Sequence, residues 1–367
     1  MGNIRLIFLS LFAILFVASP VIAQTENATS KKLENEKPFA PNPALKEKGD
    51  EDEVTRPSPG EIEQKILDRA RSSLGELEPG ADVAYGYFQR GLYLSALAAA
   101  TDLAETGDGA AQALIGELYR QGLGVVKDQK IAFSWFKLGA DNNNREAAFQ
   151  LGFMHLDGIG TEQNKQEAAR YFSIAAEQNH VLGLYNVGLM RLTGEVLEKD
   201  LTIAADHLLR AAKLGNHDAQ FAMGELYREG HGVKKDDILA TIYFGQAARG
   251  GHDTAQIEYA MRLLNGIGIR KNEEDAARWF LVNARAGNAI AQNRLAHLYR
   301  TGAGVPLDPL SSARWHLISK KQGFEDKHLD VLLSELDEEA KSAATEMAEK
   351  WVPTHRLSST LARQPDR

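Results

Sequence analysis

Residues 111–144 read AQALIGELYRQGLGVVKDQKIAFSWFKLGADNNN, and this stretch decides the fold because it returns at a fixed interval. Shifting the sequence against itself by 36 residues aligns six copies between Ala111 and about Phe324. Self-similarity with a period of 20–50 residues is the signature of a solenoid. Three columns of the alignment hold in all six copies: a small-residue column (Gly116, Gly152, Gly188, Gly224, Ala260, Ala296), a turn-glycine column (Gly122, Gly158, Gly194, Gly230, Gly266, Gly302) and a capping column (Asp128, Asn164, Asp200, Asp236, Asn272, Asp308).

Each copy predicts two helices. In the first copy, Leu114 and Leu118 lie four residues apart on one apolar face, which is typical of a helix. Gly122 follows that face, at the place where a left-handed residue ends a helix. Asp128 then offers an oxygen to cap a second helix over residues 129–141. The repeating unit is therefore predicted as helix, glycine-rich turn, capped helix and short turn.

The small-residue column falls in the middle of the first helix, where glycine costs about 1 kcal/mol relative to alanine. We expect it to mark a place where two helix backbones approach too closely for a side chain. Aromatic residues of the second helix are expected to fill the neighbouring space as core. These residues are Trp135, Tyr171, Tyr243, Trp279 and Trp315 in one column and Phe136, Phe172, Phe244 and Phe280 in the next.

Three stretches carry a family resemblance: residues 111–144 quoted above, AQFAMGELYREGHGVKKDDILATIYFGQAARGG at 219–251, and AQNRLAHLYRTGAGVPLDPLSSARWHLI at 291–318. They resemble the Sel1-like repeat, a relative of the tetratricopeptide repeat with a longer internal turn. The resemblance covers six consecutive repeats. It implies an all-α, right-handed superhelical solenoid of antiparallel helix pairs that serves as a protein-binding scaffold, without implying a particular partner. The third repeat has Val196 in place of the second turn glycine, so we expect an irregular turn there.

Composition excludes several classes of function. The chain has 367 residues, of which 44% are hydrophobic and 25% charged, so it is long enough to bury a large core. Its net charge of −8 is spread along the chain, without the basic patch that a nucleic-acid-binding protein needs. Because the chain has no cysteine, it has no disulfide, no thiolate nucleophile and no Cys-ligated zinc.

Residues 1–23 have the pattern of a cleavable signal peptide, because Arg5 precedes an apolar run at 6–17 and Pro20 breaks that run before Ala23. The run is shorter than the roughly 20 residues that span a bilayer, although an uncleaved anchor is the alternative. A bacterial-style signal without cysteine favours a periplasmic or secreted protein. No membrane insertion is expected after the signal is removed.

The remaining segments are predicted as follows. Residues 24–57 form a disordered linker rich in proline and charge. Residues 58–110 hold N-terminal helices and a capping repeat, with one helix from Ser58 to about Leu74 and a helix pair over 81–105 that turns at Gly91. The six repeats occupy 111–325, a C-terminal capping helix occupies 326–352, and a disordered tail occupies 353–367.

No motif in the sequence points to catalysis. The Gly-x-Gly turns follow helices instead of strands and lack a third glycine at the needed spacing, which argues against a dinucleotide-binding loop. His180 and His252 lie two periods apart, too far to share a metal, and are interpreted as polar turn residues. HExxH, GxSxG and Cys/His ligand spacings are absent from the sequence. We therefore predict no enzyme activity, no cofactor and no metal.

The candidate binding residues lie on the first helices, at the positions three before, one after and four after the small-residue column. In repeats two, three and five these positions are apolar, which predicts an exposed hydrophobic strip of the kind that usually marks a partner surface. Arginines at its edge could hold carboxylates. The alternative is that tight curvature buries the strip between helices. The predicted groove residues are Arg120, Phe149, Phe153, Leu156, Tyr185, Leu189, Leu192, Phe221, Glu225, Arg228, Ile257, Met261, Leu264 and Arg300.

The sequence thus predicts an exported scaffold or adaptor that holds a protein or peptide in a concave groove, in envelope signalling or assembly. A cell-wall or polysaccharide-associated accessory protein is the alternative, and it would need exposed aromatic rings on a polar groove. An unrecognised hydrolase is a weaker alternative. Neither the partner nor the oligomeric state follows from the sequence.

Overall fold

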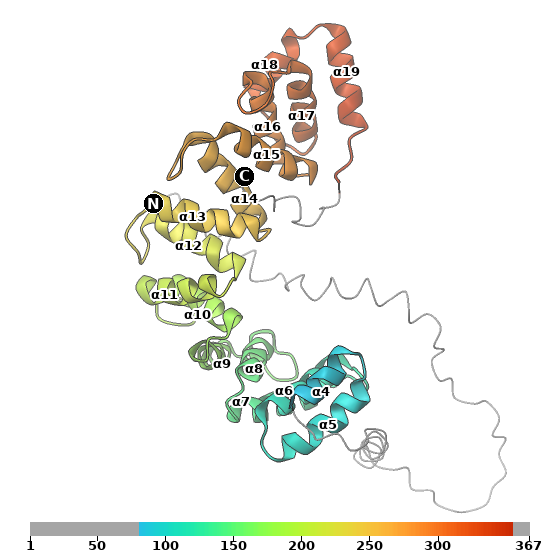
Figure 1. Cartoon of the computed structure of the whole chain (residues 1–367), viewed down its shortest axis with the longest axis vertical. Coiled ribbons are helices and arrows are strands. Elements are labelled where there is room, and N and C mark those ends of the chain that lie inside the picture. The colour runs from blue at the N-terminus through green and yellow to red at the C-terminus, as the bar shows by residue number, and fades with distance from the viewer. Residues whose placement is uncertain (1–80, 355–367) are drawn as a thin grey trace, which may run out of the picture. The chain divides into compact units, whose positions relative to one another are not determined.

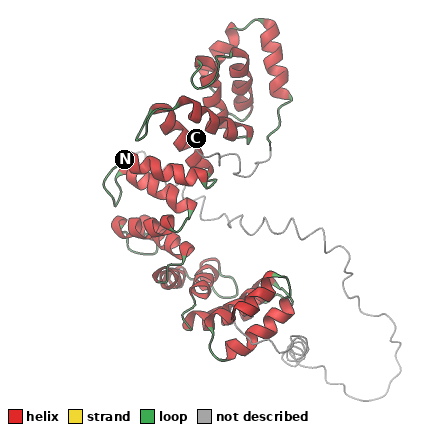
Figure 2. Ribbon diagram, in the orientation of Figure 1, coloured by secondary structure: helices red, strands yellow, loops and turns green. Residues whose placement is uncertain are grey.

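A computed structural model describes residues 81–354 of the chain (Figure 1). Every regular element in that range is an α-helix, as the colouring in Figure 2 shows. The predicted signal peptide, the linker, the helix from Ser58 and the tail beyond residue 354 lie outside the described residues.

The helices follow one another in the predicted order. Two helices precede the repeats, α4 (Ala81–Gln89) and α5 (Tyr93–Glu105). The first helices of the six repeats are α6 (Gly109–Gln121), α8 (Arg145–Asp157), α10 (Val181–Thr193), α12 (His217–Glu229), α14 (Asp253–Asn265) and α16 (Ala289–Thr301). The second helices are α7 (Gln129–Asp141), α9 (Lys165–Glu177), α11 (Leu201–Lys213), α13 (Asp237–Arg249), α15 (Glu273–Arg285) and α17 (Pro309–Lys321). Two more follow, α18 (Lys327–Glu335) and α19 (Glu338–Glu349).

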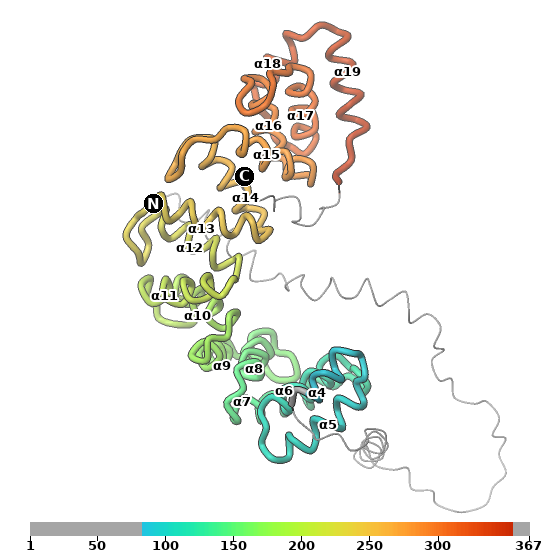
Figure 3. Tube along the Cα trace, in the orientation of Figure 1, coloured from blue at the N-terminus to red at the C-terminus, as the bar shows by residue number. Residues whose placement is uncertain are grey.

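Each helix packs against its neighbours in the chain. A first helix contacts the second helix of its own repeat and the second helix of the repeat before it. The tube in Figure 3 shows the resulting series of two-helix hairpins. The described part of the chain is therefore an all-α solenoid of 36-residue helix pairs, as the sequence predicts.

The turn and capping columns have the predicted conformations. Oδ1 of Asp128 accepts hydrogen bonds from the backbone amides of Lys130 and Ile131, at 2.8 and 3.0 Å, and each of the other five capping residues accepts from one or two amides of its own helix. All six turn glycines end their helices in the left-handed region, with φ between 71° and 77°. Each first helix therefore stops, and each second helix starts, at a position fixed by one residue type.

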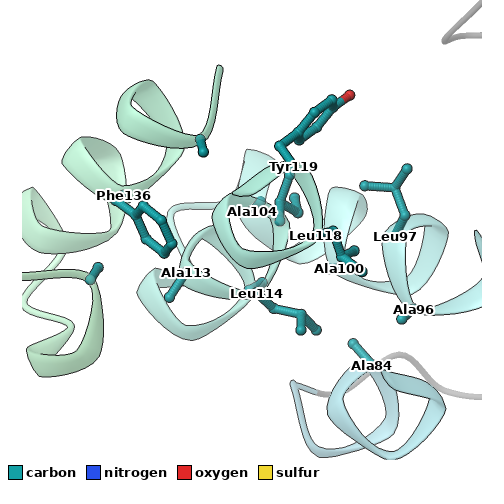
Figure 4. Packing of buried hydrophobic residues seen from close by; sticks show 14 of the residues in the cluster. Ala84, Ala96, Leu97, Ala100, Ala104, Ala113, Leu114, Leu118, Tyr119 and Phe136 are labelled. Carbon is teal, nitrogen blue, oxygen red and sulfur yellow. The ribbon is translucent and has the colours of Figure 1, made fainter. Parts of the chain in front are cut away.

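The small-residue column does not have the predicted cause. A Cβ atom on Gly152 would lie 2.5 Å from Cδ1 of Phe172, and one on Gly116 would lie 2.8 Å from Cδ1 of Phe136. The nearest atoms thus belong to a side chain of the second helix, an aromatic ring at Gly116, Gly152 and Gly224 and Leu208 at Gly188, and not to a second backbone. The expectation that aromatics fill the space beside the small residues is confirmed, because Phe136 is buried in the cluster shown in Figure 4.

Two backbones do meet at the second turn glycine, which five of the six repeats have. Gly160 has a φ of +70°, and a Cβ atom there would collide with the carbonyl oxygen of Gln129, the first residue of the preceding second helix. The equivalent glycines at 124, 232, 268 and 304 also have positive φ. Val196 occupies this position in repeat three without a positive φ. The irregular turn predicted for that repeat is therefore confirmed.

The ends of the repeat array differ in detail from the prediction. The helix pair α4–α5 is present, with Gly91 in the left-handed region, but the first repeat begins at Gly109, two residues earlier than predicted, because Asp108 caps its helix. The single C-terminal helix predicted over 326–352 is wrong. Leu336 is extended and Asp337 starts a new helix by accepting from the amide of Ala340 at 2.8 Å, so the segment forms α18 and α19.

Candidate partner-binding surface

Only two of the fourteen predicted groove residues, Phe153 and Arg300, are exposed, and six, including Glu225, are buried. We use "first-helix face" for the predicted groove positions on α6, α8, α10, α12, α14 and α16. On this face Tyr185, Leu189, Leu192, Phe221 and Ile257 are buried. The prediction of a continuous exposed strip is therefore wrong at these five positions. The next repeat covers such positions, as when the ring of His252 stacks on Phe221 with 4.4 Å between ring centroids.

The most exposed apolar side chain of the first-helix face lies on α8. Phe153 is 39% exposed, whereas Phe149 and Leu156 are half-buried on the same helix. The three side chains lie three or four residues apart and so share one face of α8, which we call the α8 patch. The ring of Phe149 packs against the ring of Phe172, with 5.6 Å between centroids, and against the ring of His180, with 4.4 Å between centroids. Met261 and Leu264 on α14 are also half-buried.

All three predicted arginines have partners within the chain, and for two of them the partner is a carboxylate. The guanidinium of Arg120 donates two hydrogen bonds to Glu117, at 2.7 and 2.6 Å, and this pairing raises the pKa of Arg120 despite partial burial. Arg228 donates to Oε2 of Glu225 at 2.5 Å. Arg300 is exposed and donates to the carbonyl oxygen of His328 at 3.3 Å. Of the three, Arg300 therefore has the weakest partner.

A cluster of three carboxylates surrounds Arg228 between α12 and α14. Besides Glu225, the guanidinium contacts Glu229 at 2.9 Å and Glu258 at 3.7 Å. Burial raises the pKa of Glu225 to about 7; Arg228 opposes this rise, and the neighbouring Glu258 and Glu229 add to it. Three acids around one arginine leave this part of the first-helix face negatively charged when all are ionised.

The comparisons with known proteins agree with this architecture. The family described as Sel1 repeat matches residues 109–144, 145–180, 181–216, 217–252, 254–288 and 289–324, which together make up more than half of the chain. The chain belongs to the Sel1 repeat family. Proteins built from Sel1 repeats generally mediate protein–protein interaction and are typically not enzymes.

Two solved structures illustrate the likeness. A Sel1 repeat protein from Oxalobacter formigenes is 33% identical over 66% of this chain and 100% of its own, with a TM-score of 0.55. A protective antigen present in uropathogenic Escherichia coli strains is 21% identical over 74% of this chain and 67% of its own, with a TM-score of 0.50, and this likeness shows the fold alone. None of the curated proteins compared with the chain matches it.

Sequence reasoning missed the role of two histidines in these Sel1 repeats. His180 and His252 are not only polar turn residues, because each caps a first helix. Nδ1 of His180 accepts from the amide of Gly183 at 3.1 Å, and Nδ1 of His252 accepts from the amide of Ala255 at the same distance. The signal was present in the sequence, since the same column holds Asn144, Asn216 and Asn288, and asparagine is a favoured N-cap.

A buried arginine was also missed. Arg262 is 4% exposed in a column that otherwise holds leucine or methionine. Its guanidinium donates to Oγ1 of Thr241 at 3.0 Å and to Oδ1 of Asp237 at 3.4 Å, and it lies 5.0 Å from the ring centroid of Phe244. These contacts replace an apolar contact between repeats four and five with a polar one.

At the C-terminal end, three polar residues join α16 to α18. Nδ2 of Asn293 donates to Oδ2 of Asp326 at 2.9 Å, and Nε2 of His297 lies 2.8 Å from the same oxygen. Burial by itself would raise the pKa of Asp326, but the hydrogen bonds from Asn293 and His297 outweigh it and hold that pKa well below the usual range. This end of the first-helix face is therefore occupied by the chain itself.

Among residues 81–354, no group of three or more His, Asp or Glu residues is placed to hold a metal ion. Within the same range, no helix is both long enough and apolar enough to cross a bilayer. A hollow of about 1130 Å³ beside the turns of repeats five and six is open to solvent, and charges of both signs from Arg270, Lys271, Glu273 and Glu274 line it.

Proposed function

We propose that this Sel1 repeat protein is an exported scaffold that holds a partner protein or peptide against the first-helix face, with the α8 patch as the anchor. The family relationship supports the general role of binding proteins. The single observation that supports the location is the exposure of Phe153, in a column where Leu189 is buried and Met261 half-buried. Exposed aromatic side chains on well-packed supports are typical anchors of protein interfaces.

The charges around the α8 patch favour a basic partner segment. Glu146 and Asp157 are exposed on the same helix beside one exposed cation, Arg145, and the carboxylates around Arg228 lie two repeats further along. A segment with lysine or arginine beside large apolar residues would match both features. We therefore expect the bound segment to be amphipathic and positively charged.

Export is the part of the proposal that rests on sequence alone. The pattern of residues 1–23 supports removal of a signal peptide, and envelope signalling or assembly is the corresponding role. Mass spectrometry of the protein purified from the envelope fraction should find Gln24 as the first residue. A full-length chain recovered from the cytoplasm would refute export and leave the binding proposal standing.

A substitution on the α8 patch tests the binding proposal. Phe153→Ser removes the anchor, and Ile238→Ser is the matched control because Ile238 is a 60% exposed apolar residue on a second helix. Cells carrying each tagged variant are treated with a chemical crosslinker, and the purified adducts are compared. We expect Phe153→Ser to lose a defined adduct that the wild type and Ile238→Ser keep, at equal melting temperatures. Retention of the adduct by Phe153→Ser would contradict the proposed location.

A further inference from the structure

Two junctions between consecutive repeats share a set of three residues that the other junctions lack. His180 caps α10 beside Phe149 and Glu146 of the preceding first helix, and His252 caps α14 beside Phe221 and Asp218. The other three junctions are capped by Asn144, Asn216 and Asn288. The position of the phenylalanine holds Ala113, Tyr185 and Ile257 at these junctions, in that order. The position of the carboxylate holds Ala110, Leu182 and Thr254. Histidine thus appears as the cap only where a phenylalanine and an acid accompany it.

The geometry requires both caps to be neutral. Each imidazole stacks on its phenylalanine at 4.4 Å between ring centroids, and each Nδ1 accepts a backbone amide proton at 3.1 Å. An imidazole nitrogen accepts a hydrogen bond only while it carries no proton. Protonation would replace this acceptor with a donor and place a positive charge at a helix N-terminus, where positive charge is unfavourable.

The two junctions differ in what compensates such a charge. Nε2 of His180 lies 3.1 Å from Oε2 of Glu146, within hydrogen-bonding distance, whereas Nε2 of His252 lies 3.7 Å from Oδ1 of Asp218. The residue before the carboxylate also differs. Arg145 precedes Glu146 and reaches the carbonyl oxygen of Gln178 at 3.5 Å, whereas His217 precedes Asp218. The His180 junction already accommodates the permanent cation of Arg145, whereas the equivalent residue of the His252 junction, His217, is a cation only when protonated.

His252 is surrounded by few groups that could stabilise its cationic form. The ionisable groups that act on it are Asp218 and His217, both on α12, while Arg249 ends α13 and Asp253 begins α14. His217 lies against the turn leading to His252, because a Cβ atom on Gly250 would collide with its ring. Burial holds the pKa of His252 below its ordinary value of 6.5, with Asp218 acting in the opposite direction and His217 adding to the fall.

We propose that the junction between repeats four and five is an acid-sensitive joint, at which protonation of His252 removes the N-cap of α14 and loosens α14 from α12 and α13. The junction between repeats two and three, capped by His180, should stay closed over the same pH range because the carboxylate of Glu146, 3.1 Å from Nε2, compensates a positive charge on that ring. This device acts on the solenoid whether or not the α8 patch binds a partner.

Amide hydrogen exchange of the full chain tests the proposal. Protection factors, corrected for the intrinsic pH dependence of exchange, are compared about one pH unit above and one below the ordinary histidine pKa. In the wild type, peptides covering α13 and α14 should lose protection by roughly tenfold on acidification, the size expected for the loss of one N-cap. Peptides covering α9 and α10 should change little.

Matched variants identify the group responsible. His252→Asn installs the cap that the chain uses at Asn216 and Asn288, so it should keep α14 protected at the lower pH, and His180→Asn should leave the wild-type response unchanged. Persistence of the loss in His252→Asn, or an equal loss around α10, would overturn the proposal. As an independent check, the Cε1 proton resonance of His252 in the folded chain should titrate below the ordinary histidine pKa, in keeping with its burial. Titration of His252 at or above that value would also overturn the proposal.

Discussion

Leu189 and Phe153 occupy the same column in consecutive repeats but meet different surroundings. Leu189 is 6% exposed, whereas Phe153 keeps 39% of its surface in solvent. Burial of a large apolar side chain contributes roughly 1.5–3 kcal/mol, so the two residues should differ in what they contribute to folding. Residue type alone does not separate core from surface in this column.

Alanine substitutions should separate the two residues. We expect Leu189→Ala to lower the free energy of unfolding by about 2–4 kcal/mol, because it leaves a cavity. Phe153→Ala should lower it by less than about 1 kcal/mol, because much of the ring is already solvated. Denaturant unfolding followed by circular dichroism measures both. Equal losses would show that Phe153 belongs to the core.

Glu225 gives the stability of the chain a pH dependence of defined sign. Its pKa is about 7 in the folded chain, against an ordinary value of 4.5. Between these values the folded state holds more protons than the unfolded state, so stability falls as pH rises through this window. Glu225→Gln removes this titration. As pH rises across the window, the free energy of unfolding of the variant minus that of the wild type should therefore increase by on the order of 1–3 kcal/mol. Denaturant unfolding at several pH values checks this, and a pH-independent difference would contradict it.

At the scale of the helix, the repeated glycines are explained by the side chain that faces each of them, a phenylalanine ring in repeats one, two and four and Leu208 in repeat three. The sequence predicted the positions of the helices well, because Asp128, Gly122 and their equivalents mark the ends with residue types that have few other uses there. It did not predict the cause of the small-residue column, since a missing side chain does not reveal whether a ring or a backbone takes its place. The break at Asp337 was missed because the apolar spacing continues across it.

Two glycine-to-alanine substitutions should have opposite signs. Gly152→Ala places a methyl group 2.5 Å from the Phe172 ring, and we expect a loss of about 1–3 kcal/mol despite the better helix propensity of alanine. At Gly86 in α4, a Cβ atom would meet nothing within 4 Å in the described part of the chain beyond its own helix, so Gly86→Ala should gain up to about 1 kcal/mol. Thermal unfolding of both variants provides the comparison. A neutral Gly152→Ala would show that the ring can move aside at little cost.

At the scale of the whole molecule, the extent to which successive repeats cover one another could not be predicted from the sequence, and neither could the set of residues that stay exposed. The period gives the number of helix pairs and their order, and both are confirmed. The candidate site depends on the offset between neighbouring pairs, which the period does not contain. For this reason Leu189 and Phe153, which occupy the same predicted groove column, end in different environments.

Helices α18 and α19, at the C-terminal end of the solenoid, should be needed to keep the protein soluble. α19 packs on α17, with 6.2 Å between the ring centroids of Trp315 and Trp351, and Asp330 of α18 contacts the buried His316 at 2.8 Å. Terminal elements of solenoids cover apolar surface that would otherwise be exposed. We expect removal of residues 327–367 to cause aggregation, measured by light scattering during size-exclusion chromatography. An elution profile identical to that of the full chain would argue against this capping role.

The central claim is that a partner lies against the α8 patch, and a photoreactive amino acid placed at position 153 tests it most directly. The same probe at position 238 serves as the control, since both sites are exposed and only the first lies on the first-helix face. After illumination of cells, we predict one defined protein adduct from position 153 and none of the same mass from position 238. Adducts of equal yield at both positions, or an adduct at position 238 alone, would contradict the claim.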